Sequence, residues 1–125
     1  MEENRTSGRL IGAAIEVHKT LGPGLLESTY QRCLAHELRL RGIAFEQEVA
    51  VGVNYKGLEI DGAYRADFIV SNSLVVELKS TDRIEPVHKA QLLTYLKWSR
   101  LNVGLLINFN VRVLKSGICR IVNSK

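Results

Sequence analysis

The chain has 125 residues, two cysteines and a formal net charge of +4. Apolar residues make up 46% and charged residues 24%, a mix that excludes a disordered or fibrous chain. No apolar run reaches the ~18 residues that a membrane span needs, and the acidic start lacks the basic and apolar regions of a signal peptide. We therefore expect a single domain over residues 1–125, located in the cytoplasm and without a membrane partner.

Charge is distributed unevenly along the sequence. Residues 1–85 contain 10 Lys or Arg and 13 Asp or Glu, whereas residues 86–125 contain 7 Lys or Arg and no acidic residue. An excess of positive charge in one segment favours an anionic partner, most often nucleic acid. A solubilising surface without any partner would give the same counts, so the charge alone leaves both interpretations open.

Two helical patterns come first in the chain. Apolar residues three and four positions apart predict a helix over Thr6–Leu21, which Gly22-Pro23-Gly24 ends. The same spacing predicts a second helix over Leu25–Arg41, with Gly42 as its C-terminal stop. The side chains of this second helix that we expect to face inward are Leu26, Tyr30, Cys33, Leu34 and Leu38.

Four strands are predicted next, as two hairpins. The first hairpin joins Phe45–Tyr55 to Leu58–Tyr64 through Lys56-Gly57, and the second joins Ala66–Val70 to Leu74–Leu78 through Ser71-Asn72-Ser73. The run Leu74-Val75-Val76 is apolar on both faces, which is typical of a central strand.

A third helix and two more strands complete the pattern. The helix is expected over Pro86–Ser99, because proline suits a first helical turn. Val103–Phe109 is typical of a buried strand, and Gly117–Val122 of an edge strand. Two helices, three or four strands, a helix and two strands predict an α/β (α+β) fold, with a mixed central sheet flanked by helices.

The predicted strand that ends near residue 79 carries two charges among apolar residues. Side chains alternate between the faces of a strand, so Val75, Glu77 and Lys79 share one face. Burying a charge is costly unless it is paired or bound to a metal ion. The strand end could instead be exposed, with Glu77 and Lys79 as an ordinary surface pair.

Asp67 is another charge inside an apolar run, on the preceding strand. Because a three-residue turn joins the two strands, Asp67 can lie near Glu77, although the sequence does not fix the register. Two adjacent carboxylates raise each other's pKa unless a cation lies between them. Their hard oxygen atoms suit Mg²⁺ or Mn²⁺, with water and a substrate phosphate as further ligands.

Other polar residues occupy the predicted helices. Glu27 lies in the first turn of the second helix, where the helix dipole by itself favours an acidic residue. Gln91 and Tyr95 are four positions apart on the third helix, so they share a face and form either part of a site or a half-buried pair. The residues that we expect only to pack or to lie on the surface are His18, His36, His88, Trp98, Cys33 and Cys119.

These residues together resemble the PD-(D/E)xK nuclease superfamily. Asp67, Glu77 and Lys79 are similar to its D…(D/E)xK signature, with Ala66 in place of the proline. Gly24-Leu25-Leu26-Glu27-Ser28-Thr29-Tyr30 matches the G-x-x-E-x-x-Y motif of a family of small proteins within that superfamily.

Two further segments resemble the RecB-like exonuclease branch of the same superfamily. Gln91-Leu92-Leu93-Thr94-Tyr95 is similar to its Q-x-x-x-Y helix, and Gly62–Asp67 to its glycine-led approach to the catalytic aspartate. The resemblance covers about Arg9–Phe109 and implies a restriction-endonuclease-like core in the order ααβββαβ.

The resemblance implies a Mg²⁺- or Mn²⁺-dependent nuclease that hydrolyses phosphodiester bonds, with DNA as the expected substrate. It implies that the metal ligands are Asp67, Glu77, the backbone carbonyl of Leu78, and Glu27. Lys79 would act with these carboxylates in catalysis, by orienting or activating the attacking water. The residues expected on the substrate side are Gln91, Tyr95, Tyr30, Lys89 and Lys97.

Two other classes of function stay open from the sequence. The first is a nucleic-acid-binding module that keeps the fold without turnover. The second is an interaction protein, for example a dimerising partner in a larger complex, in which the carboxylates are structural. A homodimer stays open for each of these functions. Salt-dependent binding without cleavage would indicate the first, and a stable oligomer without affinity for nucleic acid would indicate the second.

Overall fold

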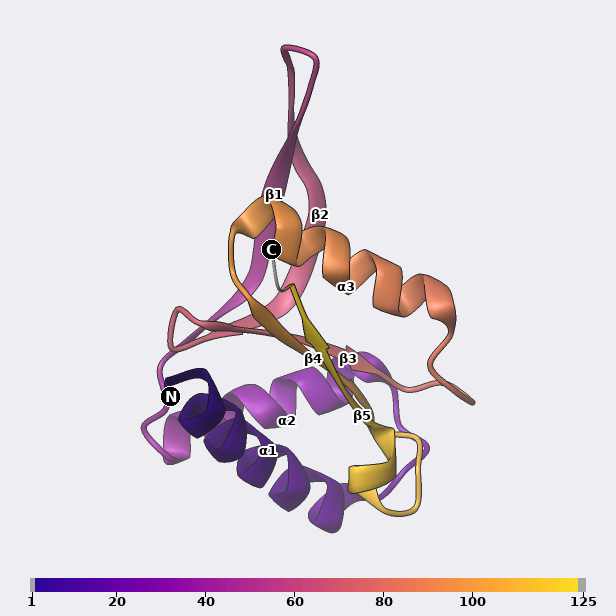
Figure 1. The fold of residues 1–125 in the computed structure, drawn as a ribbon. Coiled ribbons are helices and arrows are strands. Elements are labelled where there is room, and N and C mark those ends of the chain that lie inside the picture. The colour runs from indigo at the N-terminus through magenta and orange to yellow at the C-terminus, as the bar shows by residue number, and fades with distance from the viewer. Residues whose placement is uncertain (1, 124–125) are drawn as a thin grey trace.

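The computed structural model describes residues 2–123, and its centre is a five-stranded sheet with helices on both faces (Figure 1). The elements in chain order are α1 (Glu2–Leu21), α2 (Glu27–Leu40), β1 (Phe45–Tyr55), β2 (Leu58–Val70), β3 (Leu74–Lys79), α3 (Pro86–Ser99), β4 (Val103–Asn108), the 3₁₀ helix η1 (Leu114–Gly117) and β5 (Ile118–Val122). This order confirms the predicted α+β fold with a mixed, helix-flanked sheet.

The strands lie side by side in chain order, β1 to β5. β1, β2 and β3 are antiparallel neighbours, and α3 then crosses over the sheet so that β4 runs parallel to β3. β5 pairs antiparallel with β4 and forms one edge of the sheet. β3 is therefore the central strand, as its run of apolar residues predicted.

Two hydrophobic cores lie on opposite faces of the sheet. On one face, Leu74, Val76 and Leu78 of β3 belong to the core that α1 and α2 cover. On the other face, Val75 packs in the core that α3 covers with Leu92 and two further side chains. The alternation of β3 thus sends Glu77 toward the face of α3, where it is only 4% exposed.

β2 differs from the prediction of two strands, because it is a single strand with a sharp change of face. Ala66 packs on the α3 side of the sheet. Phe68, two residues later, would share that side in a regular strand, but it packs on the side of α1 and α2. Opposite this point, Glu48 of β1 has a left-handed backbone with φ of 54°. The pairing continues across it at the same register, from Val49–Ala66 to Gln47–Phe68, so both strands turn over together.

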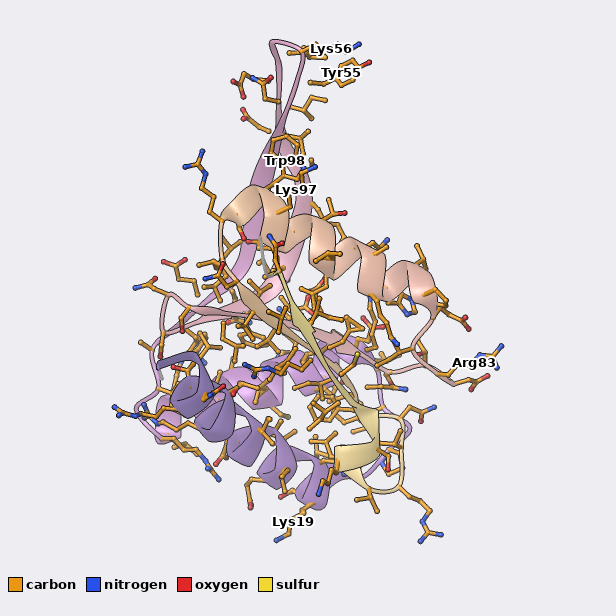
Figure 2. All side chains as sticks on the ribbon, viewed as in Figure 1. Lys19, Tyr55, Lys56, Arg83, Lys97 and Trp98 are labelled. Carbon is orange, nitrogen blue, oxygen red and sulfur yellow. The ribbon has the colours of Figure 1, made fainter. Side chains whose placement is uncertain are left out.

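Beyond the sheet, β1 and β2 continue as a two-stranded arm that projects from the body (Figure 1). Val53 pairs with Ile60 and Tyr55 with Leu58, which places the four side chains on one face of the arm. Three of them are exposed, Tyr55 by 60%, Leu58 by 59% and Ile60 by 42%. Tyr55 lies beside Lys56 at the tip (Figure 2).

Some details of the helices correct the sequence analysis. α1 begins at Glu2 rather than at Thr6, and α2 begins at Glu27, two residues later than predicted. The expectation that Leu26 faces inward is wrong, because Leu26 precedes the helix as its N-cap and is 74% exposed. His18 is buried, and its Nε2 lies 2.7 Å from the carbonyl oxygen of Val111.

The two cysteines, Cys33 and Cys119, are half-buried and form no disulfide. Within residues 2–123, no helix has the length and apolar character needed to cross a membrane.

We predict that Gly117→Ala destabilises the protein by about 1–3 kcal/mol, because a Cβ there would overlap the backbone carbonyl of Asn108. Thermal or urea unfolding measures the loss. Gly8→Ala is the matched control, since nothing lies within 4 Å of a Cβ at that exposed helical position. The control is expected to be neutral or slightly stabilising, because alanine favours a helix more than glycine does. An unchanged Gly117→Ala protein would contradict the packing around η1.

Candidate active site

The candidate site lies at a fork where β2 and β3 separate. Their ladder ends at the pair Phe68–Val76, and the next residues outward are Asp67 and Glu77. The backbone N–H of Asp67 donates to Glu77 Oε1 at 2.8 Å, and the backbone N–H of Leu78 donates to Asp67 Oδ2 at 2.8 Å. Each strand therefore binds the carboxylate of the other, and the two acidic side chains are adjacent.

Burial raises the pKa of both carboxyl groups. For Glu77, burial is the largest cause and the negative charge of Asp67 adds to it, which raises the pKa to about 7. Burial also raises the pKa of Asp67, against the hydrogen bond from Leu78 and the positive charge of Lys79, which lower it. A cation binds favourably between two neighbouring carboxylates that are partly shielded from water, because it stabilises the negative charge of both.

Tyr64 is a site residue that the sequence analysis did not single out. The Tyr64 hydroxyl donates to Glu77 Oε2 at 2.6 Å, and the Tyr64 hydroxyl oxygen also lies 3.4 Å from Gln91 Oε1. Burial, followed by the contact with Glu77, raises the pKa of this phenol above its ordinary value. Tyr64 is three residues from Asp67, which in a flat strand would place it on the opposite face. The change of face in β2 brings it to the site.

The loop before α2 is held in place by two hydroxyl groups. Tyr30 is fully buried, and its hydroxyl donates to the carbonyl of Gly22 at 2.6 Å and accepts from the N–H of Leu25 at 3.1 Å. Ser80 donates its hydroxyl to the carbonyl of Leu25 at 2.6 Å. These contacts connect the loop that leads into Glu27 to the end of β3.

Glu27 and Lys79 complete the electrostatic environment of the site. Glu27 is exposed at the first position of α2, and its charge raises the pKa of Asp67 and of Tyr64. Lys79 is half-exposed, and its charge lowers the pKa of both Asp67 and Glu77. The charges of Glu27 and Lys79 therefore both act on Asp67, and that of Lys79 also acts on Glu77.

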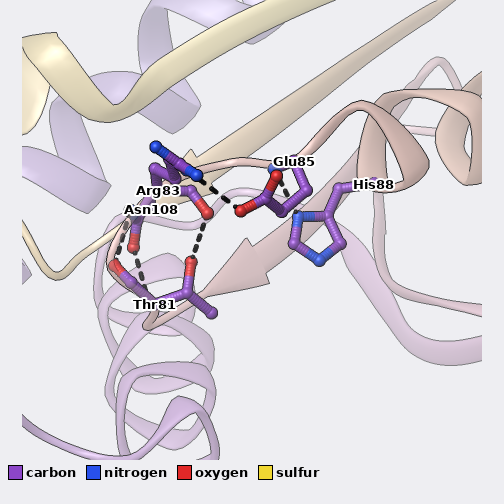
Figure 3. Close-up of polar contacts among 5 residues, drawn as sticks. All are labelled: Thr81, Arg83, Glu85, His88 and Asn108. Carbon is purple, nitrogen blue, oxygen red and sulfur yellow. Dashed lines mark hydrogen bonds and ion pairs between the residues drawn. The ribbon is translucent and has the colours of Figure 1, made fainter.

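The turn after β3 is fixed by buried Asn108 (Figure 3). Asn108 accepts from the N–H of Thr81 at 3.1 Å and donates to its carbonyl at 3.0 Å. Further along, Arg83 pairs with Glu85 at 3.1 Å, and the N–H of Glu85 donates to His88 Nδ1 at 2.9 Å. Glu85 is thus the N-cap of α3, and the side chain of His88 in the first turn accepts from its N–H, so the chain between Lys79 and α3 is held at both ends.

The residues expected on the substrate side occupy different surroundings. Gln91 is half-buried, and its Oε1 lies 3.4 Å from the hydroxyl of Tyr64. Tyr95 is 1% exposed and donates its hydroxyl to the carbonyl of Val49 at 2.8 Å, so it connects α3 to the point where β1 turns over. Tyr30 is likewise inside the protein. Both tyrosine hydroxyl groups therefore bind backbone carbonyls inside the protein, and neither ring is on the surface.

Two lysines were also expected on the substrate side. Lys89 and Lys97 are both exposed on α3. The Nζ of Lys97 lies 5.7 Å from the ring centroid of Trp98, near the base of the arm (Figure 2).

The donor set fits a hard divalent cation that keeps water ligands. Asp67 and Glu77 supply carboxylate oxygens on rigid strands, and each oxygen that accepts one hydrogen bond retains a second lone pair. Within residues 2–123, no three Asp, Glu, His or Cys side chains lie close enough together to hold a metal ion. The backbone carbonyl of Leu78, water and phosphate oxygens would have to complete the shell, which is how Mg²⁺ is commonly bound.

The mixed sheet and the carboxylates at its fork define a restriction-endonuclease-like domain. The family model of the PD-(D/E)XK nuclease superfamily matches residues 4–121, and the chain therefore belongs to this superfamily. The narrower G-x-x-E-x-x-Y family and the RecB-like branch stay predictions.

A solved structure supports the fold. The crystal structure of SSO0001 is 26% identical in sequence, with a TM-score of 0.53 over 75% of this chain and 47% of that chain. This chain therefore spans about half the length of that protein. A search of curated proteins found no match.

We predict that Glu77→Gln stabilises the protein above pH 7, by about 1–2 kcal/mol in the absence of divalent ions. The raised pKa of Glu77, about 7, means that the folded state holds a proton which the unfolded state releases near the ordinary value of 4.5. The free energy of unfolding of the wild type should therefore fall as the pH rises from about 4.5 to 7. The variant has no ionisable group at this position, so its free energy of unfolding should not fall for this reason. Thermal unfolding in a chelator at pH 4.5 and pH 8 measures the difference.

An equal effect of Glu77→Gln at both pH values would contradict the raised pKa. Glu59→Gln is the matched control, because Glu59 is exposed on the arm. Its stability should follow that of the wild type at both pH values.

Proposed function

We propose that this protein is a metal-dependent nuclease that hydrolyses phosphodiester bonds, with DNA as its substrate. Membership of the PD-(D/E)XK nuclease superfamily supports the general activity. The observation that carries the proposal is the fork, where Asp67 and Glu77 lie together within the electrostatic reach of Lys79 and Glu27.

The cation would be Mg²⁺ or Mn²⁺, held by Asp67, Glu77 and the carbonyl of Leu78, with Glu27 contributing directly or through water. When bound, such a cation supplies positive charge to a phosphate and lowers the pKa of a water molecule. Its binding also favours the ionised form of both carboxyl groups, which burial otherwise disfavours.

The protein residues would orient the reactants for in-line attack. Water forms a new bond to phosphorus and gives up a proton to the solvent, while the bond from phosphorus to the leaving oxygen breaks and the leaving alkoxide takes up a proton from the solvent. The ammonium group of Lys79 would stabilise the negative charge that develops on the phosphoryl oxygens. Tyr64 and Gln91 would limit the freedom of the Glu77 side chain, because both lie against it or against its hydrogen-bond partner. Lys89 would contact a neighbouring phosphate.

The second candidate function is a nucleic-acid-binding domain without turnover. The observation that favours it is that, with Tyr30 and Tyr95 buried, the two substrate-side residues left exposed are Lys89 and Lys97, which can bind phosphate but lie outside the fork. Binding without cleavage in Mg²⁺ and in Mn²⁺ would support this second function.

We predict that Mn²⁺ binds to the wild-type protein at neutral pH and that Asp67→Asn weakens binding at least tenfold. The asparagine oxygen can still accept the hydrogen bond from the Leu78 N–H, so the variant should fold. Isothermal titration calorimetry measures the difference, with Asp61→Asn on the exposed arm as the matched control. Equal binding by Asp67→Asn and the wild type would show that the cation is held elsewhere. If neither binds, the titration is repeated with an uncleavable oligonucleotide, and a second failure would refute the proposed metal site.

We predict that Lys79→Met lowers the rate of cleavage at least 100-fold and leaves Mn²⁺ affinity within about threefold of the wild type. Single-turnover assays on labelled single-stranded DNA, duplex DNA and RNA, each with Mg²⁺ and Mn²⁺, measure cleavage and identify the substrate. Lys115→Met is the control, because Lys115 is exposed in η1, outside the fork. Full activity in Lys79→Met would refute the assigned role, and exclusive cleavage of RNA would overturn the choice of DNA.

A further inference from the structure

Two leucines are exposed on the loop that leads into Glu27. Leu26 is 74% exposed and Leu25 is 40% exposed. The helical spacing of the sequence predicted Leu26 on the same inner side as Tyr30, but α2 begins only at Glu27, and Leu26 turns outward as its N-cap. The exposed segment 23–26 contains no charged residue. The surface directly before Glu27 is therefore apolar.

The backbone around Leu26 is held by hydrogen bonds on both sides. The hydroxyl of Tyr30 accepts from the N–H of Leu25 at 3.1 Å, and Ser80 donates its hydroxyl to the carbonyl of Leu25 at 2.6 Å. The carbonyl of Leu26 itself accepts from the N–H of Thr29 at 3.0 Å. The side chain of Leu26 is therefore presented to solvent from a backbone whose conformation is fixed.

This loop lies beside the candidate active site. The ring of Tyr30 stacks on that of Phe109 with 4.5 Å between the centroids, and the N–H of Phe109 donates to the last carbonyl of β3 at 2.9 Å. Glu27, which directly follows Leu26, lies close enough to the fork for its charge to raise the pKa of Asp67. Leu26 thus projects from a fixed position next to the fork.

We propose that Leu26 packs against the face of an unpaired base next to the scissile phosphate, so that the substrate is single-stranded or locally unpaired DNA. This inference rests on the proposed function, which places a phosphate at the fork. One sugar joins each flanking base to that phosphate, which brings a base within reach of the loop. A leucine on a fixed backbone loses little conformational freedom when a base covers it, and the contact removes apolar surface from water.

An unpaired base fits this surface better than duplex DNA does. In a duplex, stacking covers the faces of the bases, and only their polar edges are open in the grooves. Leucine has no donor or acceptor with which to bind such an edge. An unpaired base exposes its face, and contacts with base faces are tolerant of sequence. A strand that carries phosphate is also favoured over a protein partner, because a cation at the neighbouring fork would attract phosphate.

Binding of short DNA strands tests the proposal. Fluorescence anisotropy is measured with a labelled single strand, with the matching duplex, and with an abasic strand that keeps every phosphate and lacks every base. Ca²⁺, which also binds carboxylate oxygens, replaces Mg²⁺ in these titrations. We expect Leu26→Ala to weaken binding of the natural single strand about fivefold to tenfold, and to leave binding of the abasic strand within about twofold of the wild type.

Leu40→Ala is the matched control for this experiment. Leu40 is 68% exposed at the last position of α2, about 20 Å along the helix from Leu26. The control should bind every strand as the wild type does. Thermal unfolding of both variants shows that a loss of binding is not a loss of the fold.

A larger side chain provides a second test that does not depend on weakening the contact. Leu26→Trp should bind the natural single strand about threefold more tightly than the wild type, because an aromatic ring stacks on a base. The added tryptophan fluorescence should be quenched by the natural strand and not by the abasic strand. Leu40→Trp should show no quenching with either strand.

Three results would overturn the proposal. The first is an equal loss of affinity of Leu26→Ala for the natural and the abasic strand, which would show that no base is contacted. The second is an equal loss for single strand and duplex, which would make paired DNA the ligand. The third is wild-type binding of every strand by Leu26→Ala, which would assign the exposed leucines to a protein partner.

Failure of this inference can be distinguished from failure of the proposed function. In each of the three cases, cleavage by the wild type would leave the proposed nuclease intact and remove only the contact with a base. A wild-type protein that neither binds nor cleaves any strand would refute both.

Discussion

The reciprocal hydrogen bonds between the carboxylates and the backbone of Asp67, Glu77 and Leu78 are the contacts on which the site depends. Where β2 and β3 separate, two N–H groups would otherwise lose their partners in a half-buried position. A buried donor without a partner costs about 1–3 kcal/mol. The carboxylates satisfy these donors, so the residues that would bind a cation also close the end of the ladder. The fold and the site are therefore built from the same atoms.

Hydrogen bonds on both faces of the sheet fix the segments that surround the site. Tyr30 and Ser80 fix the loop that delivers Glu27, and Asn108 fixes the turn that follows Lys79. On the other face, α3 brings Gln91 to the hydroxyl of Tyr64. Side chains that are held by packing and hydrogen bonds before a ligand arrives need little rearrangement to bind it.

The sequence predicted most of the elements because their physical signals are local. Pro86 marks the start of α3, and strict alternation placed Glu77 on the same face as Val75, which the structure shows to be the face that α3 covers. The register between Asp67 and Glu77 could not be predicted, because it depends on a turn and on long-range packing. Tyr64 was missed for a related reason. Its place at the site follows from a left-handed residue on the partner strand, Glu48, which alternation does not reveal.

The hydrogen bonds at the fork have a consequence for how such a site would change if its chemistry were no longer needed. The backbone donors need only an oxygen acceptor, and the amide oxygen of asparagine or glutamine would serve as well as a carboxylate. The negative charges at Asp67 and Glu77 are not required by the architecture, and burial works against them. If the charge were no longer needed, amides at both positions would therefore leave the backbone hydrogen bonds of the fork intact. The negative charge at these two positions, more than the presence of polar residues there, therefore distinguishes a site that binds a cation from one that has lost this function.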